Sequence, residues 1–221
     1  MYGTILFTDI VGSSNLWRKD SKNMKRMLSN HFNLINKLSK QNDGFIVKTI
    51  GDAFMLFFKN STTSCSLYNA IKCGIEIVQQ EPLPLRIGIC YGQMDCEIQN
   101  IQNSKLKDYF GNTVNTASRM ESKISPEAGI TFSYTEPINE TQSEKIKKLL
   151  DDGKFTLTKV KFSSNCSNDS DMLLDSQTRF RSNRLLTDLQ IQACKNIEEL
   201  HGISDIIAFT FTVKGGKRYS I

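Results

Sequence analysis

The stretch "ILFTDIVGSSNLW", residues 5–17, combines an apolar run with a carboxylate and a turn of small residues. The β-favouring residues before Asp9 predict a buried strand, and the Gly-Ser-Ser sequence after Val11 predicts a loose turn. A carboxylate at the end of a buried strand is costly unless a cation lies against it. This stretch therefore predicts a cation beside Asp9.

Outward from this strand, apolar residues predict alternating strands and helices. Helical spacing over 14–40 and over 66–80 predicts two helices. Two strand-like runs over 44–58 meet at Gly51 and Asp52, which is typical of a hairpin tip. The remaining predicted elements are a strand at 85–94, a helix at 111–124, a strand at 129–134, a helix at 141–150 and a closing hairpin at 206–221. This alternation predicts an α/β or α+β protein.

The segment 163–183 is polar and rich in Ser and Asn, which predicts an exposed insertion or loop. A helix is predicted after it, at 184–202. Because 221 residues suit one domain, we interpret 1–221 as a single domain that carries this insertion.

Composition narrows the class of protein. A net charge of +5 without a basic stretch that also carries aromatic residues argues against nucleic-acid binding. No apolar run is long enough for a membrane-spanning helix, so no membrane segment is predicted. The six cysteines form no CxxC pair, which indicates reduced thiols. We therefore expect a cytoplasmic protein or the cytosolic part of a longer one.

Asp9 and Asp52 are the candidate metal ligands. Both stand at predicted strand ends, and two carboxylates that converge from separate strands suit a hard divalent cation such as Mg²⁺. Taken singly, each has a simpler interpretation, because Asp9 could cap the following helix and Asp52 could serve its turn.

Three motifs occur in order along the chain: "FTDIVGS" at 7–13, "VKTIGDAFM" at 47–55 and "FGNTVNTASRMES" at 110–122. Together they resemble the class III nucleotidyl cyclases, the catalytic domains of adenylyl and guanylyl cyclases. The resemblance covers residues 3–135 and resumes at "VKGGKRY", 213–219. It implies an α+β sandwich, with a ferredoxin-like or palm-like, mostly antiparallel sheet and flanking helices.

The resemblance also implies roles for individual residues. Asp9 and Asp52 match the carboxylates that bind two Mg²⁺ or Mn²⁺ ions, with the Ile10 carbonyl as a further ligand. Asn115 and Arg119 match the pair that orients the ribose and stabilises charge on the α-phosphate, and their i, i+4 spacing puts both on one helical face. The implied phosphate contacts come from the turn formed by Val11, Gly12, Ser13 and Ser14 and from Lys214 in the closing hairpin.

Lys48 and Asp108 match the two positions that select the base in the family. Lys and Asp resemble the adenylyl pattern, whereas guanylyl members typically show Glu and Cys. Lysine donates to N1 of adenine and aspartate accepts from its amino group, whereas guanine reverses both polarities. The implied reaction is adenylate cyclase, the conversion of ATP to cyclic AMP and pyrophosphate. GTP or a pyrimidine triphosphate is the alternative substrate.

Family resemblance further implies a head-to-tail homodimer whose sites lie at the interface. Other classes stay open at this point. Polymerase-like palm domains, including diguanylate cyclases, also display two metal carboxylates, although "IGDAF" (50–54) has only part of their motif. A non-catalytic cyclase-homology module that regulates a partner is the second alternative, and a basic nucleic-acid-binding protein is the third.

Overall fold

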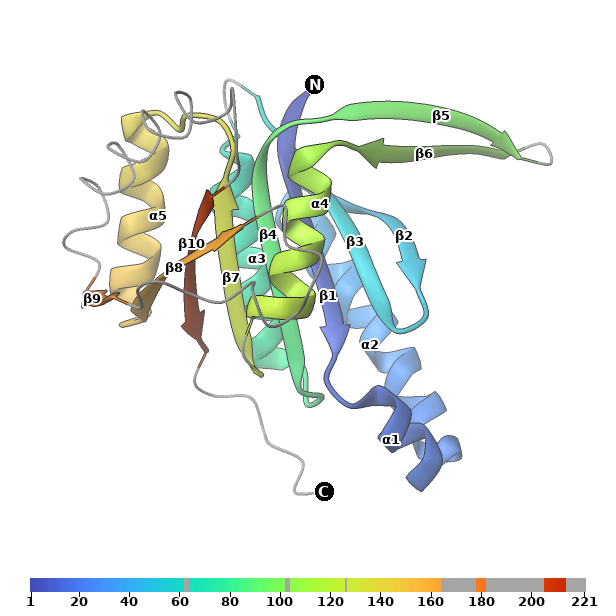
Figure 1. The fold of residues 1–221 in the computed structure, drawn as a ribbon. Coiled ribbons are helices and arrows are strands. Elements are labelled where there is room, and N and C mark those ends of the chain that lie inside the picture. Colours follow the sequence, from blue (N-terminus) through green and yellow to red (C-terminus); the bar gives the residue numbers. More distant parts are fainter. Residues whose placement is uncertain (62–63, 102–103, 126, 164–177, 182–204, 214–221) are drawn as a thin grey trace.

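A computed structural model describes residues 1–61, 64–101, 104–125, 127–163, 178–181 and 205–213 (Figure 1). The strands are β1 (Tyr2–Ile10), β2 (Gly44–Ile50), β3 (Ala53–Lys59), β4 (Leu85–Gln93), β5 (Asp95–Ile101), β6 (Ser104–Phe110), β7 (Gly129–Tyr134), β8 (Thr156–Ser163), β9 (Thr178–Arg181) and β10 (Asp205–Thr212). The helices are α1 (Ser13–Lys19), α2 (Ser21–Gln41), α3 (Ser66–Gln80), α4 (Asn112–Arg119), the π-helical turn η1 (Met120–Ile124) and α5 (Glu140–Asp152).

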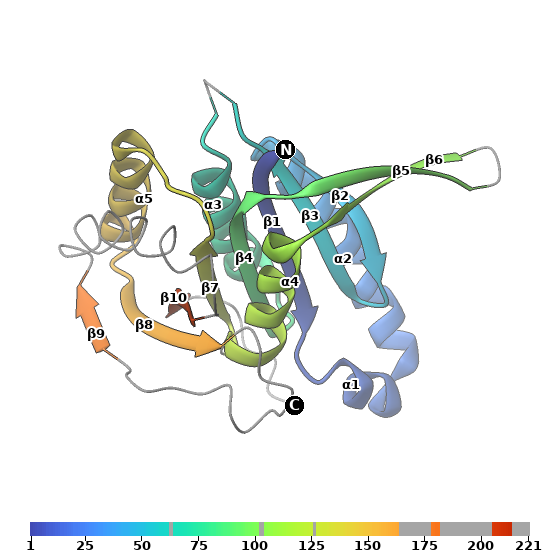
Figure 2. The same ribbon diagram turned by 45° about the horizontal axis from the view of Figure 1, so that its top comes forward.

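A mixed sheet of eight strands forms the centre of the described chain, in the order β2-β3-β1-β4-β7-β10-β8-β9. Strands β4 and β7 pair in parallel, and the other neighbours in this sheet pair antiparallel. Strands β5 and β6 form a separate hairpin that projects from the sheet (Figure 2). The predicted α+β fold with a mostly antiparallel sheet is confirmed.

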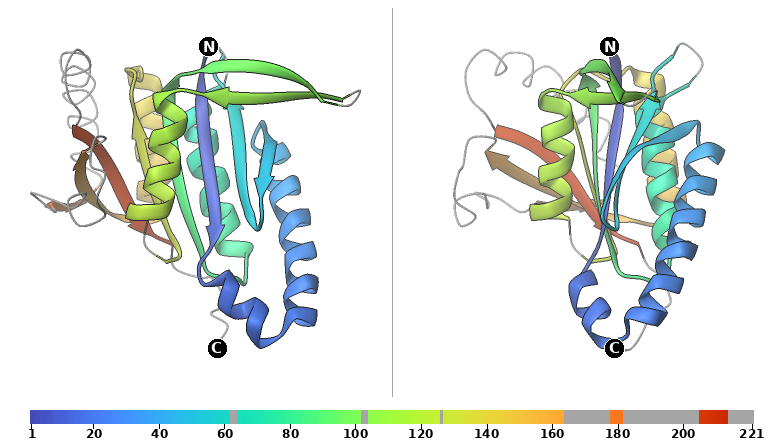
Figure 3. Two further views of the ribbon diagram at one scale, coloured as in Figure 1. Left: turned by 45° about the vertical axis from the view of Figure 1, so that its right-hand side comes forward. Right: turned by 90° about the vertical axis from the view of Figure 1, so that its right-hand side faces the viewer.

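Helices cover both faces of the sheet (Figure 3). The alternation of side chains along β1 explains the layers, because successive residues of a strand point to opposite faces. Leu6 and Ile10 belong to the core cluster shared with α2, α3 and α5. Ile5 and Phe7 belong to the second cluster, which packs under α4. Asp9 continues the series of Ile5 and Phe7, so strand periodicity places it on the α4 face.

A buried hydrogen bond between His31 and Glu81 ties α2 to the end of α3. His31 Nδ1 lies 2.7 Å from Glu81 Oε2, and the two side chains are 0% and 2% exposed. Glu81 Oε1 also accepts a hydrogen bond from the backbone of Leu83. The histidine therefore has a packing role, and removal of either partner would leave an uncompensated buried group.

Several predicted elements are confirmed and others need correction. The hairpin over 44–58 and the helix at 66–80 are confirmed by β2, β3 and α3. The single helix over 14–40 is wrong, because Asp20 adopts a non-helical backbone conformation between α1 and α2 and caps α2 by accepting from the backbone of Asn23. The helix at 111–124 is α-helical to Arg119 and then becomes the π-helical turn η1.

The C-terminal predictions are tested in part. The first arm of the closing hairpin is β10, which lies between β7 and β8, while residues 214–221 are outside the described residues. The loop predicted over 163–183 is wrong at 178–181, where β9 pairs with β8 because its backbone completes the sheet edge. Most of that loop and the predicted helix at 184–202 lie outside the described residues.

Candidate active site

The two candidate metal carboxylates lie at one end of the sheet. Strand β1 pairs antiparallel with β3 so that Thr8 lies opposite Phe54, which puts Asp9 next to the β2–β3 turn. Gly51 has a positive φ of 64° in this turn, and Asp52 follows it. The Oδ2 atom of Asp52 is buried and has no hydrogen-bond partner among the described residues. A buried carboxylate oxygen without a donor fits a bound cation.

The chain turns sharply after Asp9. Ile10 is 1% exposed, and the backbone of Val11 donates to the Pro84 carbonyl over 2.8 Å. Gly12 has a φ of 72°, a left-handed conformation that favours glycine, and nothing lies within 4 Å of where its Cβ would be. Ser13 and Ser14 then begin α1, which has no side-chain cap. The turn thus leaves open space beside the backbone.

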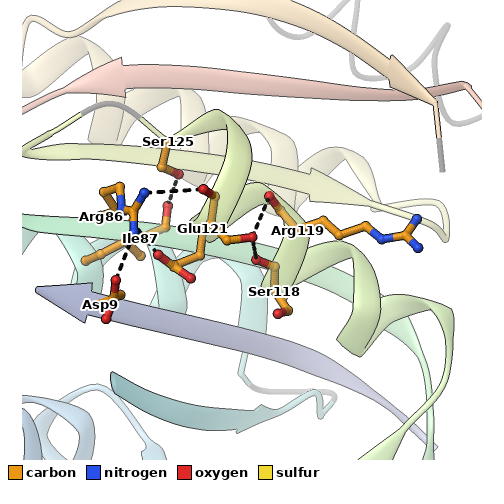
Figure 4. Close-up of polar contacts among 8 residues, drawn as sticks. Asp9, Arg86, Ile87, Ser118, Arg119, Glu121 and Ser125 are labelled. Atoms are coloured by element: carbon orange, nitrogen blue, oxygen red, sulfur yellow. Dashed lines mark hydrogen bonds and ion pairs between the residues drawn. The ribbon is translucent and has the colours of Figure 1, made fainter. Parts of the chain in front are cut away.

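A cation from the chain itself lies against Asp9. Arg86 in β4 is the register partner of Asp9, and its Nη2 atom lies 2.8 Å from Asp9 Oδ2 (Figure 4). The Nε atom of Arg86 lies 3.4 Å from Oε1 of Glu121 in η1. Sequence reasoning missed both Arg86 and Glu121, although an arginine within the apolar strand "LRIGIC" (85–90) was a signal for a buried counter-charge.

The carboxyl group of Glu121 has a pKa well above its ordinary value. Burial, and to a lesser degree the charge of Asp9, raise the pKa of its carboxyl from 4.5 to about 7, while Arg86 acts the other way. The described residues contain no group of three or more His, Cys, Asp or Glu side chains placed to hold a metal ion. Ions at this edge would therefore need ligands beyond Asp9 and Asp52, such as a backbone carbonyl, water or substrate phosphate.

The predicted base-selecting residues meet in the structure. Lys48 Nζ lies 2.6 Å from Asp108 Oδ2 and 2.8 Å from its Oδ1 atom, which joins β2 to β6. The pairing of β2 with β3 is irregular between Ile46 and Lys48, and such a bulge re-aims the side chain that follows. The lysine side chain is 41% exposed and the aspartate 21%, so both are accessible to a ligand.

Asn115 and Arg119 lie on α4, and both are exposed. The Arg119 guanidinium points away from the cluster of Asp9, Arg86 and Glu121 (Figure 4). Within one chain, the structure therefore brings Asp9 near Asp52 and Lys48 to Asp108, and it does not bring Arg119 to Asp9. Lys214 lies outside the described residues.

Residues 3–159 match the family described as the adenylate and guanylate cyclase catalytic domain. The chain belongs to this family. This match sets aside the palm-domain and nucleic-acid-binding alternatives. Members of the family typically use two metal ions and act on nucleotide substrates.

None of the described helices is both long and apolar enough to cross a membrane.

Curated relatives of this cyclase domain include proteins of both specificities. It is 30% identical over 138 residues to an adenylate cyclase of Podospora anserina, a match that covers 52% of this chain and 6% of that protein. It is also 30% identical over 133 residues to the guanylate cyclase soluble subunit beta-2 of Rattus norvegicus, covering 54% of this chain and 19% of that subunit. The chain thus spans a small part of these relatives.

The fold agrees with a solved cyclase structure. The guanylate cyclase domain of RhGC from Catenaria anguillulae, in complex with GTP, superposes with a TM-score of 0.60 at 20% identity. The superposition covers 96% of each chain. This likeness shows the cyclase fold.

Proposed function

We propose that the domain is an adenylate cyclase that converts ATP to 3′,5′-cyclic AMP and pyrophosphate. The observation that carries this choice of base is the contact between Lys48 and Asp108. A lysine donor and an aspartate acceptor side by side suit N1 and the amino group of adenine. Guanine would present a donor to Lys48 and an acceptor to Asp108, so both groups would be left unpaired.

The residues at the sheet end suit intramolecular phosphoryl transfer. Asp9, Asp52 and the Ile10 carbonyl would hold two Mg²⁺ or Mn²⁺ ions, and the buried, unpartnered Oδ2 atom of Asp52 supports this assignment. When bound, such ions favour ionisation of the ribose 3′-hydroxyl and neutralise charge on the leaving pyrophosphate. Catalysis then depends on position and charge, with no covalent step at the protein.

The other predicted residues act on the substrate in this proposal. Arg119 directs its planar guanidinium to the charge that develops on the α-phosphate, and Asn115 orients the ribose. In the turn from Val11 to Ser14, the Val11 amide already donates to the Pro84 carbonyl, so the amides of Gly12, Ser13 and Ser14 face the β- and γ-phosphates, and Gly12 leaves room for close approach. Lys214 contacts the triphosphate.

We propose further that two chains pair head to tail, so that each site takes its carboxylates from one chain and its base-selecting and Asn/Arg groups from the other. The direction of Arg119 away from Asp9 within one chain supports this arrangement (Figure 4). The β5–β6 hairpin also exposes apolar side chains that a partner could cover: Leu106 and Phe110, 50% and 40% exposed, lie on one face, and Ile98, opposite Lys107 and 56% exposed, lies on the other.

Assays with ATP, GTP, CTP and UTP, each with Mg²⁺ and with Mn²⁺, test the proposal by product chromatography. We expect cyclic AMP from ATP at a higher kcat/KM than for any other nucleotide. A preference for GTP or a pyrimidine triphosphate would overturn the choice of base. No cyclic product from a folded protein, with any nucleotide, would instead support a non-catalytic regulatory module.

A further inference from the structure

One arginine links the candidate metal carboxylate to the helix on the α4 face. Arg86 Nη2 donates to Asp9 Oδ2 over 2.8 Å, and Arg86 Nε lies at the ion-pair distance of 3.4 Å from Glu121 Oε1 without a hydrogen bond between them. Its Nη1 atom also donates to the Ser122 carbonyl over 3.3 Å. The three nitrogens of one guanidinium thus face two carboxylates and a backbone carbonyl (Figure 4). A planar fork makes such divergent contacts, whereas a lysine ammonium would not hold the same geometry.

The backbone around this cluster is closely packed. A Cβ at Gly88 in β4 would meet the Ala117 carbonyl oxygen at 2.2 Å and the Glu121 backbone nitrogen at 2.3 Å, so η1 can lie this close only against glycine. Ser125 Oγ donates to the Ile87 carbonyl over 2.6 Å. Glu121 is therefore held by the fold in front of Arg86, within a π-helical turn, a feature often found at functional sites.

We propose that Arg86 is a positioning residue for the metal site: it fixes the orientation of the Asp9 carboxylate and is itself held by Glu121 and η1. This inference rests on the proposed role of Asp9 as a metal ligand. Arg86 engages the Oδ2 atom of Asp9, which restrains the rotation of the carboxylate and leaves its second oxygen for a cation. Groups that orient a ligand in this way typically change metal affinity by about 10- to 100-fold when they are altered.

Charge alone predicts the opposite result, and this difference makes the inference testable. Arg86 is a positive charge beside a proposed cation site, so its removal should strengthen cation binding if only electrostatics matter. If Arg86 orients Asp9, its removal should weaken cation binding instead. Arg86→Lys separates the electrostatic effect from the orienting effect further, because it keeps the positive charge and loses the planar guanidinium.

The experiment is a titration of the purified chain, residues 1–221, with Mn²⁺ in the absence of nucleotide. Free Mn²⁺ is measured by electron paramagnetic resonance. We expect Arg86→Lys and Arg86→Met each to weaken Mn²⁺ binding by about tenfold or more. Arg26→Met is the matched control, because Arg26 is exposed on α2 and contacts Asn23 of its own helix. This control should bind Mn²⁺ like the wild type. Thermal unfolding without metal verifies that each variant is folded.

The outcomes separate this inference from the proposed function. If the wild type binds Mn²⁺, Asp9→Asn abolishes that binding, and both Arg86 variants bind as tightly as the wild type or more tightly, the positioning role is overturned and the metal assignment stands. If Arg86→Met fails to fold, the Mn²⁺ affinity of folded Arg86→Lys, compared with that of Arg26→Met, still decides whether Arg86 has the positioning role. If Asp9→Asn binds Mn²⁺ as the wild type does, both the metal assignment and the positioning role are overturned.

Discussion

Individual carboxylates at the sheet end have different environments, and these differences determine what each can do. Asp9 is compensated by Arg86 at 2.8 Å, whereas Asp52 has a buried oxygen without a partner among the described residues. Glu121 contacts Arg86 but is buried enough for its pKa to rise to about 7. The proposed metal site therefore combines a carboxylate that Arg86 contacts with one whose buried oxygen has no hydrogen-bond donor among the described residues.

At this residue scale, Asp52→Asn should abolish turnover and leave the fold intact. Without metal it should raise the melting temperature by about 2–4 °C, because removing the charge of a carboxylate whose Oδ2 atom is buried without a partner among the described residues is worth on the order of 1 kcal/mol in a domain of this size. Differential scanning calorimetry and a cyclase assay measure both effects. Near-normal turnover would remove Asp52 from the proposed site.

Glu121→Gln should change how stability depends on pH. The wild-type unfolded chain ionises this group near pH 4.5, whereas the folded chain keeps the proton until about pH 7. The folded state therefore binds more protons between these values, and its stability falls as pH rises through this window. One pKa unit corresponds to about 1.4 kcal/mol, so the advantage of Glu121→Gln over wild type should grow by about 3 kcal/mol from pH 4.5 to 7.5.

Urea unfolding of the wild type and of Glu121→Gln at several pH values measures how their difference in stability changes with pH. Asp152→Asn, a change at an exposed acid in the last turn of α5, is the matched control and should follow the wild type. A constant difference between Glu121→Gln and wild type across the window would contradict the displaced pKa of Glu121.

At the scale of elements, Lys48 and Asp108 join two strands that are distant in sequence. The ion pair ties β2 to β6, and Tyr109 stacks on Phe57 beside it with ring centroids 4.4 Å apart. The base of the β5–β6 hairpin is thereby fixed to the sheet. The proposed base-selecting residues are thus held by packing as well as by their own charges.

The double variant Lys48→Glu with Asp108→Cys should reduce ATP turnover and raise the ratio of GTP to ATP kcat/KM by at least about tenfold, because donor and acceptor are exchanged. Lys107→Glu changes a neighbouring exposed lysine on β6 and serves as the control, for which we expect an unchanged ratio. Equal ratios in the double variant and the control would show that this pair does not select the base.

Local patterns predicted the elements whose side chains face the core, and they failed where long-range pairing decides. The helix at 66–80 was predictable because its apolar side chains recur at helical spacing and become buried, as Ile71 and Ile75 do. The break at Asp20 was missed because apolar spacing continues on both of its sides. The β5–β6 hairpin was missed because exposed polar residues such as Glu97 and Lys107 dominate its strands.

In the candidate site, too, residues marked by a sequence motif were predicted, and contacts that depend on long-range pairing were missed. Asp9, Asp52, Lys48 and Asp108 were identified from motifs, and the structure brings the first two to one sheet end and the last two into contact. The Arg86 contacts were missed because they depend on the register of β1 with β4 and on the approach of η1 to Gly88. Neither feature has a local signal in the sequence.

At the scale of the whole molecule, the proposed site requires two chains. The proposed metal carboxylates lie at one sheet end, while the guanidinium of the exposed Arg119 points away from Asp9, Arg86 and Glu121 (Figure 4). A two-fold homodimer would supply both sets of groups to each of two equivalent sites. Because isolated chains would then lack a complete site, activity should also fall on dilution below the dissociation constant of the dimer.

Complementation of two inactive variants tests this account most directly. Asp52→Asn and Arg119→Ala should each be inactive, because each homodimer has both of its sites damaged. Co-expressed in equal amounts, random pairing makes about half of the dimers mixed, and each mixed dimer contains one intact site. We predict recovery of cyclic AMP formation to about a quarter of wild type. No recovery, with mixed dimers verified by native mass spectrometry, would contradict an active site shared between two chains.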